Sequence, residues 1–195
     1  MIVWLSRKLA GAMVGAGAAS EENREVYEYG LEVLLSTAAS AVFVLLAGAL
    51  IGKLLETIAF LAVFITLRST AGGFHASTHF RCFLIMMAAY AAAMALVMAV
   101  PAEVSGWVAV AVSFVSAAVV AMFAPAPHEN RPVGEEELRK FRVVSLWIAS
   151  AEGLAVVLFA VIGWSAIALA GAMGMAASAV SLVAAHAAGR KGLSA

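Results

Sequence analysis

The sequence predicts an all-α polytopic membrane protein. Of its 195 residues, 64% are hydrophobic and only 12% are charged, and the mean hydropathy is +1.01, whereas a soluble domain has about 45–50% apolar and about 25% charged residues. A membrane-spanning helix needs about 20 consecutive apolar residues, and several runs near that length occur. This composition excludes a soluble globular enzyme and a disordered chain. We expect about six membrane-embedded helices within one integral membrane domain, residues 1–195.

Charges, prolines and polar clusters divide the chain into six apolar stretches. The second is unusual because only its residues 57–67 are free of charge, which is too short for a full span. A short or broken second helix is therefore expected. The stretches are residues 31–51, 54–67, 82–100, 104–124, 143–163 and 164–186.

The N-terminal segment, residues 1–28, predicts an amphipathic helix lying in the membrane interface. Apolar residues including Ile2, Leu5 and Leu9 recur at helical spacing, ahead of the acidic stretch 21–28. A signal peptide is the alternative, because two basic residues precede a weakly apolar run. We favour the interfacial helix.

The basic residues predict that both termini are cytoplasmic. With the N-terminus inside, all of the 12 Lys and Arg residues except Lys53 fall on the inner side, as short cytoplasmic loops require. The largest polar segment, residues 125–142, is then a cytoplasmic loop. It is either a solvated connector with orienting cations or a surface that contacts a substrate.

The densest polar cluster at membrane depth is residues 68–82, between the second and third spans. It contains Arg68 and the Gly72-Gly73 pair, which predicts a turn. Irregular backbone near the hydrocarbon is tolerated only where protein or a wet cavity satisfies its amides. We therefore expect a functional site here.

Cys82, the single cysteine, begins the third span. A helix N-terminus and the adjacent Arg81 both favour its thiolate, so Cys82 is a candidate nucleophile. His75 and His79 precede it by spacings that share a helical face, and either is a candidate base. The alternatives are an inert buried cysteine and a zinc site built from these three residues, which lacks a supporting carboxylate within the cluster.

Glu152 lies in the middle of the fifth span, where an ionisable group is costly and marks a candidate functional site. It would orient a histidine, pair with an arginine, or remain protonated in a helix–helix hydrogen bond. In the last span, Ala166, Ala170, Gly174 and Ser178 recur every four residues. That spacing predicts close helix packing, within the chain or between subunits.

Arg68, the segment Gly72-Gly73-x-His75-Ala76 and Cys82 together resemble the signature of accessory gene regulator B (AgrB), a family of membrane peptidases in bacterial quorum sensing. Two further features resemble the same family. They are the Tyr29-Gly30 pair and the segment 124–132, which contains Ala-Pro-Ala-Pro and Asn-Arg-Pro. The resemblance covers nearly the whole chain.

The resemblance implies a cysteine endopeptidase in the cell membrane that removes the C-terminal tail of a short signal-peptide precursor. It implies that Cys82 is the nucleophile and His75 the base, and that the peptide leaves as a cyclic thiolactone or lactone. Residues with a possible supporting role are His79, Arg68, Gly72, Gly73 and Glu152.

The resemblance also implies a partner, an AgrD-like precursor with an acidic tail, and a homodimer without a cofactor. Cations on the cytoplasmic side would hold that tail. They are Arg81, Arg131, Arg139, Lys140 and Arg142. Nothing in the sequence supports nucleic-acid binding.

Two other classes of function compete with the peptidase. A small peptide or ion transporter would use Glu152 and the broken second span, and it would not need Cys82. A structural membrane subunit would tolerate substitution at both residues.

Overall fold

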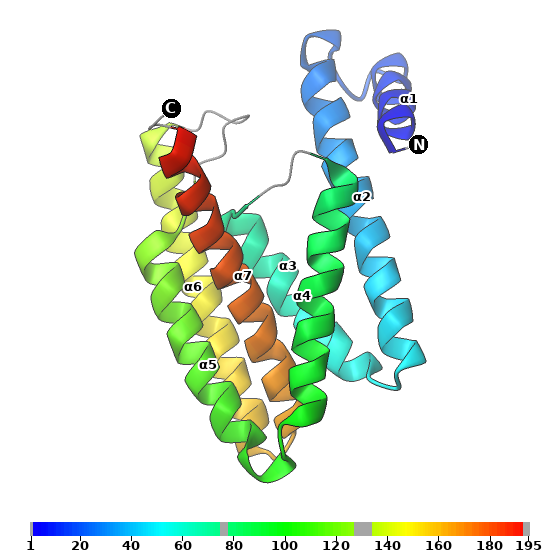
Figure 1. The fold of residues 1–195 in the computed structure, drawn as a ribbon. Coiled ribbons are helices and arrows are strands. Elements are labelled where there is room, and N and C mark those ends of the chain that lie inside the picture. The colour runs from blue at the N-terminus through cyan, green and yellow to red at the C-terminus, as the bar shows by residue number, and fades with distance from the viewer. Residues whose placement is uncertain (1, 75–77, 127–133, 193–195) are drawn as a thin grey trace. The chain divides into compact units, whose positions relative to one another are not determined.

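The computed structural model describes residues 2–74, 78–126 and 134–192 (Figure 1). These residues form seven α-helices and one short 3₁₀ helix, and no β-strand occurs among them. Six of the helices are long and apolar enough to cross a membrane. The predicted all-α polytopic membrane fold is confirmed.

The chain divides into two compact units, Met1–Ala47 and Gly48–Ala195. The prediction that residues 1–195 act as a single domain stays a prediction. The first unit contains α1 (Ile2–Gly15), the 3₁₀ helix η1 (Glu21–Asn23) and most of α2 (Arg24–Leu50). A helix was expected at the N-terminus and is present, while its place in the membrane interface stays a prediction.

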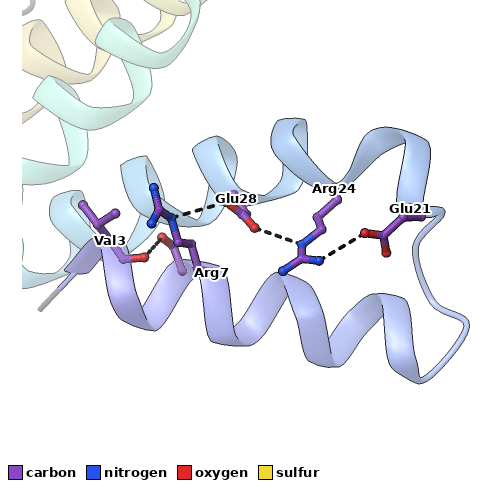
Figure 2. Close-up of polar contacts among 6 residues, drawn as sticks. Val3, Arg7, Glu21, Arg24 and Glu28 are labelled. Carbon is purple, nitrogen blue, oxygen red and sulfur yellow. Dashed lines mark hydrogen bonds and ion pairs between the residues drawn. The ribbon is translucent and has the colours of Figure 1, made fainter.

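A chain of ion pairs joins α1 to the start of α2 (Figure 2). Arg7 lies 3.7 Å from Glu28, and the other carboxylate oxygen of Glu28 accepts from Arg24 Nε at 3.0 Å. Arg24 also pairs with Glu21 at 3.1 Å, so Glu21 and Glu28 of the acidic stretch after α1 both have basic partners. Each exposed pair contributes less than about 1 kcal/mol, and together they fix the turn between the two helices.

The second unit is a bundle of five helices, in which α7 is the central one. Its most apolar window is 56% buried, against 28% or less for any other candidate span. Figure 1 shows α7 with α3, α5 and α6 around it and α4 in front. The bounds are α3 (Leu54–Ala71), α4 (His79–Ala99), α5 (Ala102–Phe123), α6 (Glu135–Val161) and α7 (Ser165–Gly192).

Small residues allow α7 to occupy the centre of the bundle. A Cβ added to Gly174 would lie 2.6 Å from the carbonyl oxygen of Phe60, so the backbones of α7 and α3 are in close contact. One turn later, the Ser178 hydroxyl donates to the carbonyl oxygen of Phe64 at 3.4 Å. The predicted packing role of the small-residue stripe is thus realised within the chain, against α3.

Helix α3 is short and continuous. Its 18 residues run without a break from Leu54 to Ala71, a length of about 27 Å at about 1.5 Å per residue, close to the ~30 Å thickness of a hydrocarbon core. Of the two forms expected for the second span, the short helix is the one observed. The chain leaves helical geometry only after Ala71.

Several helices begin earlier than their apolar runs, α4 and α6 among them. α4 begins at His79, before Cys82, and α6 begins at Glu135, so residues 135–142 of the expected polar loop are its first two turns. Three glutamates occupy the first turn of α6, where negative charge interacts favourably with the helix dipole. Charged residues therefore extend this helix beyond the hydrophobic segment that predicted it.

Candidate functional site

The candidate site lies at one end of the helix bundle. In Figure 1 the C-terminal ends of α3, α5 and α7 and the N-terminal ends of α4 and α6 lie at the same end of the second unit. Arg68, Arg81 and Cys82, which the sequence singled out in this region, are therefore at this end. Segments widely separated in sequence meet around Gly72, Gly73 and Phe74, which directly follow α3.

Gly72 ends α3 in a conformation that favours glycine, with φ at 75°. A Cβ there would lie 2.9 Å from the carbonyl oxygen of Ala126, a residue just after α5. The Ala126 amide donates to the carbonyl oxygen of Ala71 at 2.9 Å. The turn predicted at the glycine pair is present, and Gly72 is required both by its φ and by the close approach of Ala126.

Gly73 is required for a second close approach, to α7. Its φ is 146°, and a Cβ there would contact the Arg68 guanidinium and lie 2.6 Å from the Ser181 hydroxyl oxygen. A side chain at this position would displace both polar groups. The two glycines thus allow the chain to pass between the segment after α5 and the central helix.

Arg68, Phe74 and Ser181 form a closed hydrogen-bonded triangle beside Gly73. Arg68 donates through Nη1 to Ser181 Oγ and through Nη2 to the carbonyl oxygen of Phe74. The Phe74 amide donates to the Ser181 carbonyl oxygen at 2.9 Å and to Ser181 Oγ at 3.1 Å. The guanidinium also lies over the Phe64 ring, 5.8 Å from its centroid. Among the described residues no carboxylate forms an ion pair with Arg68.

Cys82 lies at the end of the first turn of α4. Thr78 caps this helix, accepting from the Arg81 amide at 3.3 Å through its hydroxyl and from the Cys82 amide at 3.0 Å through its carbonyl. The thiol is free and half-buried. The thiol thus lies at the N-terminal end of a helix, at the end of the bundle where Gly72 and Gly73 turn the chain.

The two candidate bases are not placed by the structure. His75 lies outside the described residues, and His79 is the first residue of α4 with a side chain that is also outside them. Their roles toward Cys82 stay predictions, and so does the zinc alternative. Within the part of the chain that the structure describes, no group of three His, Cys or Glu side chains is arranged to hold a metal.

Glu152 on α6 is bound to α3 and makes no contact with Cys82 that the structure records. Its Oε1 lies 2.5 Å from Thr66 Oγ1, and its Oε2 is enclosed without a hydrogen-bond partner among the described residues. The Thr66 hydroxyl also approaches the carbonyl oxygen of Ala62 at 2.6 Å. Of the three roles considered for Glu152, the helix–helix hydrogen bond is the one observed.

The candidate tail-binding cations that the structure describes lie at the same end of the second unit as the site. Arg81 is exposed in the first turn of α4. In the first turns of α6, Arg139 is exposed, Lys140 pairs with Glu136 at 2.8 Å, and Arg142 donates to the Ala121 carbonyl oxygen at 3.2 Å. Arg131 lies outside the described residues. Their role in binding an acidic tail stays a prediction.

Two residues at or near the site were not singled out by the sequence: Thr66 and Ser181. Ser181 is one of several serines in apolar helices, and 113 residues separate it from Arg68. Spacing along one helix predicts neighbours on that helix and gives no information on which distant helix faces it. The one available signal was polarity, because Thr66 and Ser181 lie in spans where a hydroxyl needs a partner.

Comparison with known proteins supplies the family. The sequence profile of accessory gene regulator B matches residues 6–182, which is most of the chain. The chain belongs to the accessory gene regulator B family. This membership places it in the processing of a quorum-sensing signal peptide at a membrane. No curated protein and no solved structure matches the chain in the same kind of search.

Proposed function

We propose that this accessory gene regulator B protein is a membrane cysteine endopeptidase that removes the C-terminal tail of a signal-peptide precursor and promotes cyclisation of the remainder. The observation that carries the proposal is the position of Cys82. The only cysteine of the chain lies in the first turn of α4, at the end of the bundle where Gly72 and Gly73 turn the chain after α3. A thiolate at such a position is a nucleophile.

In the first step, the Cys82 thiol gives its proton to His75 and the thiolate attacks the peptide carbonyl at the start of the tail. The carbon–nitrogen bond breaks, the protonated His75 gives its proton to the leaving amine, and an acyl thioester remains on Cys82. Arg68 would stabilise the negative charge on the thiolate and on the tetrahedral intermediate.

In the second step, a thiol or hydroxyl within the acyl peptide attacks the thioester. Its proton passes through His75 to the departing Cys82 sulfur, which restores the enzyme and releases a thiolactone or lactone. Transfer to a thiol keeps the energy of the thioester, whereas attack by water would lose it. A partly dehydrated site at the membrane face would favour transfer over hydrolysis.

Recognition of the substrate would use the cations near the site. Arg139 is exposed, and Arg81 lies at the start of the helix that carries Cys82. Basic side chains near a helix N-terminus form an electrostatic surface for an acidic tail. We propose that these residues, with Arg131, Lys140 and Arg142, hold the tail on the cytoplasmic side, where both termini lie.

The small-residue stripe is not available as the seam of the proposed homodimer, because Gly174 and Ser178 on α7 pack against α3 of the same chain. Any dimer contact would use another surface. The transporter alternative is not favoured by the structure, because α3 is unbroken and Glu152 is bonded to Thr66.

The experiment uses the full chain reconstituted in lipid vesicles with a synthetic precursor of a few dozen residues that carries a Cys or Ser before an acidic tail. Mass spectrometry follows tail release for wild type, Cys82→Ala, His75→Ala and His79→Ala. We expect both Cys82→Ala and His75→Ala to abolish release and His79→Ala to retain most of it. Undiminished release by Cys82→Ala would contradict the proposal.

A further inference from the structure

The hydroxyl of Ser181 has two contacts that the proposed chemistry does not yet use. It accepts from Arg68 Nη1 and from the Phe74 amide, while the Ser181 carbonyl accepts from the same amide. Ser181 lies on α7, the helix that forms the buried centre of the bundle. A segment bound to this residue is therefore tied to the most rigidly packed element of the second unit.

We infer that Ser181 is a positioning residue for the active site: with Arg68, it fixes Phe74 and so the start of the peptide unit that carries His75. The inference rests on the proposed function, in which His75 is the base. Phe74 is bound at both of its backbone groups, the amide by Ser181 and the carbonyl by Arg68. Its carbonyl belongs to the planar peptide unit shared with His75, so holding that carbonyl limits where the next residue begins.

The segment needs such an anchor because two glycines precede it. Glycine loses more conformational freedom on ordering than any other residue, and Gly72 and Gly73 both have positive φ. The triangle of Arg68, Phe74 and Ser181 supplies the bonds that offset this cost. It also holds the guanidinium, whose two donating nitrogens are directed at Ser181 and Phe74.

A substitution separates this role from general stability. Ser181→Ala removes the hydroxyl yet leaves the bond from the Phe74 amide to the Ser181 carbonyl at 2.9 Å, so we expect the fold to be retained. Ser181→Thr keeps the hydroxyl. Ser178→Ala is the matched control, because it removes a hydroxyl one turn earlier on the same helix that donates to Phe64 of α3 and not to the segment before His75.

The first arm measures the reactivity of Cys82 without any peptide substrate. The rate of alkylation of the full-length protein by iodoacetamide is followed from pH 5 to pH 10, where a free cysteine has a pKa of about 8.5. We expect Ser181→Ala to shift the curve of alkylation rate against pH in the same direction as His75→Ala does. At neutral pH, Ser181→Ala should slow alkylation about tenfold, the scale expected when a supporting bond to an active-site group is lost. Ser181→Thr should restore the wild-type profile, and Ser178→Ala should not change it.

The second arm measures the order of the segment directly, by hydrogen–deuterium exchange of peptides covering residues 72–82. Ser181→Ala should accelerate exchange there relative to Ser178→Ala, with unchanged exchange in α5. A wild-type profile and wild-type exchange for Ser181→Ala would overturn the inference. If instead His75→Ala leaves the alkylation profile unchanged, the proposed base is wrong, and the exchange arm alone then decides whether Ser181 positions this segment.

Discussion

The amide of Ala126 donates to the carbonyl oxygen of Ala71 at 2.9 Å, which ties the segment after α5 to the last residue of α3. This bond lies beside Gly72, the residue that turns the chain toward Phe74. It satisfies a carbonyl that the end of a helix otherwise leaves without a partner. The end of the short span is thus shaped by a segment that lies two helices further along the chain.

Gly72→Ala should reduce tail release at least about tenfold, because the new Cβ would lie 2.9 Å from the Ala126 carbonyl oxygen and displace the start of the site. Gly52→Ala is the control, since Gly52 has a similar φ of 69° with nothing within 4 Å of the added Cβ. Gly52→Ala has the cost of a side chain at positive φ but makes no new close contact. Equal rates of tail release for the two variants would show that the contact with Ala126 is irrelevant to the site.

Gly174→Ala should destabilise the bundle by about 1–3 kcal/mol, the range for overpacking a filled interior, because its Cβ would lie 2.6 Å from the carbonyl oxygen of Phe60. Gly153→Ala in α6 is the matched control, with nothing within 4 Å of the added carbon. It should be neutral or slightly stabilising. Thermal unfolding in detergent measures both, and an unchanged midpoint for Gly174→Ala would contradict the close packing of α7 on α3.

The sequence predicted the number of spans and the shortness of the second, because apolar length and charge are local properties of the chain. It also predicted the turn at Gly72-Gly73, since that depends on backbone freedom at two positions. The partners of Arg68 and Glu152 were not predictable in the same way. Ser181 and Thr66 come from other helices, and the faces that helices present to one another depend on packing that one sequence does not encode locally.

The starts of α4 and α6 were also predicted too late, at residues 82 and 143. Hydropathy detects the part of a helix that lies in hydrocarbon, whereas His79 and Glu135 begin helical turns that carry polar side chains. Capping by Thr78 and the acidic first turn of α6 stabilise those extensions. The length of an apolar run reflects neither the cap nor the acidic first turn.

Glu152→Gln should leave both unfolding and tail release within about twofold of wild type. The Thr66 hydroxyl has one proton and approaches three oxygens, the Ala62 and Val63 carbonyl oxygens and Glu152 Oε1. A neutral group at position 152 that donates to Thr66 therefore satisfies the geometry. Glu152→Ala should lose about 1 kcal/mol of stability, the scale of a hydrogen bond between membrane helices. Loss of tail release in Glu152→Gln with unchanged unfolding would point to an ionised, functional Glu152.

Arg139→Glu should raise KM for a precursor with an acidic tail by about two- to tenfold, the scale of one exposed charge pair, and leave kcat unchanged. Arg139 is exposed near the start of α6. A precursor with glutamines in place of the tail glutamates is the control, and the variant should process it as wild type does. Equal KM changes for both precursors would remove Arg139 from tail recognition.

The most direct test of the central claim is the intact mass of the protein during a single turnover. A precursor whose internal Cys or Ser is replaced by Ala cannot cyclise, so the acyl thioester should accumulate. The account predicts a mass increase on the protein equal to the tail-less peptide minus water. The adduct should be located on Cys82 and released by hydroxylamine. Cys82→Ser should show no adduct that hydroxylamine releases. Tail release from this precursor at the wild-type rate with no adduct on Cys82 would contradict a covalent mechanism.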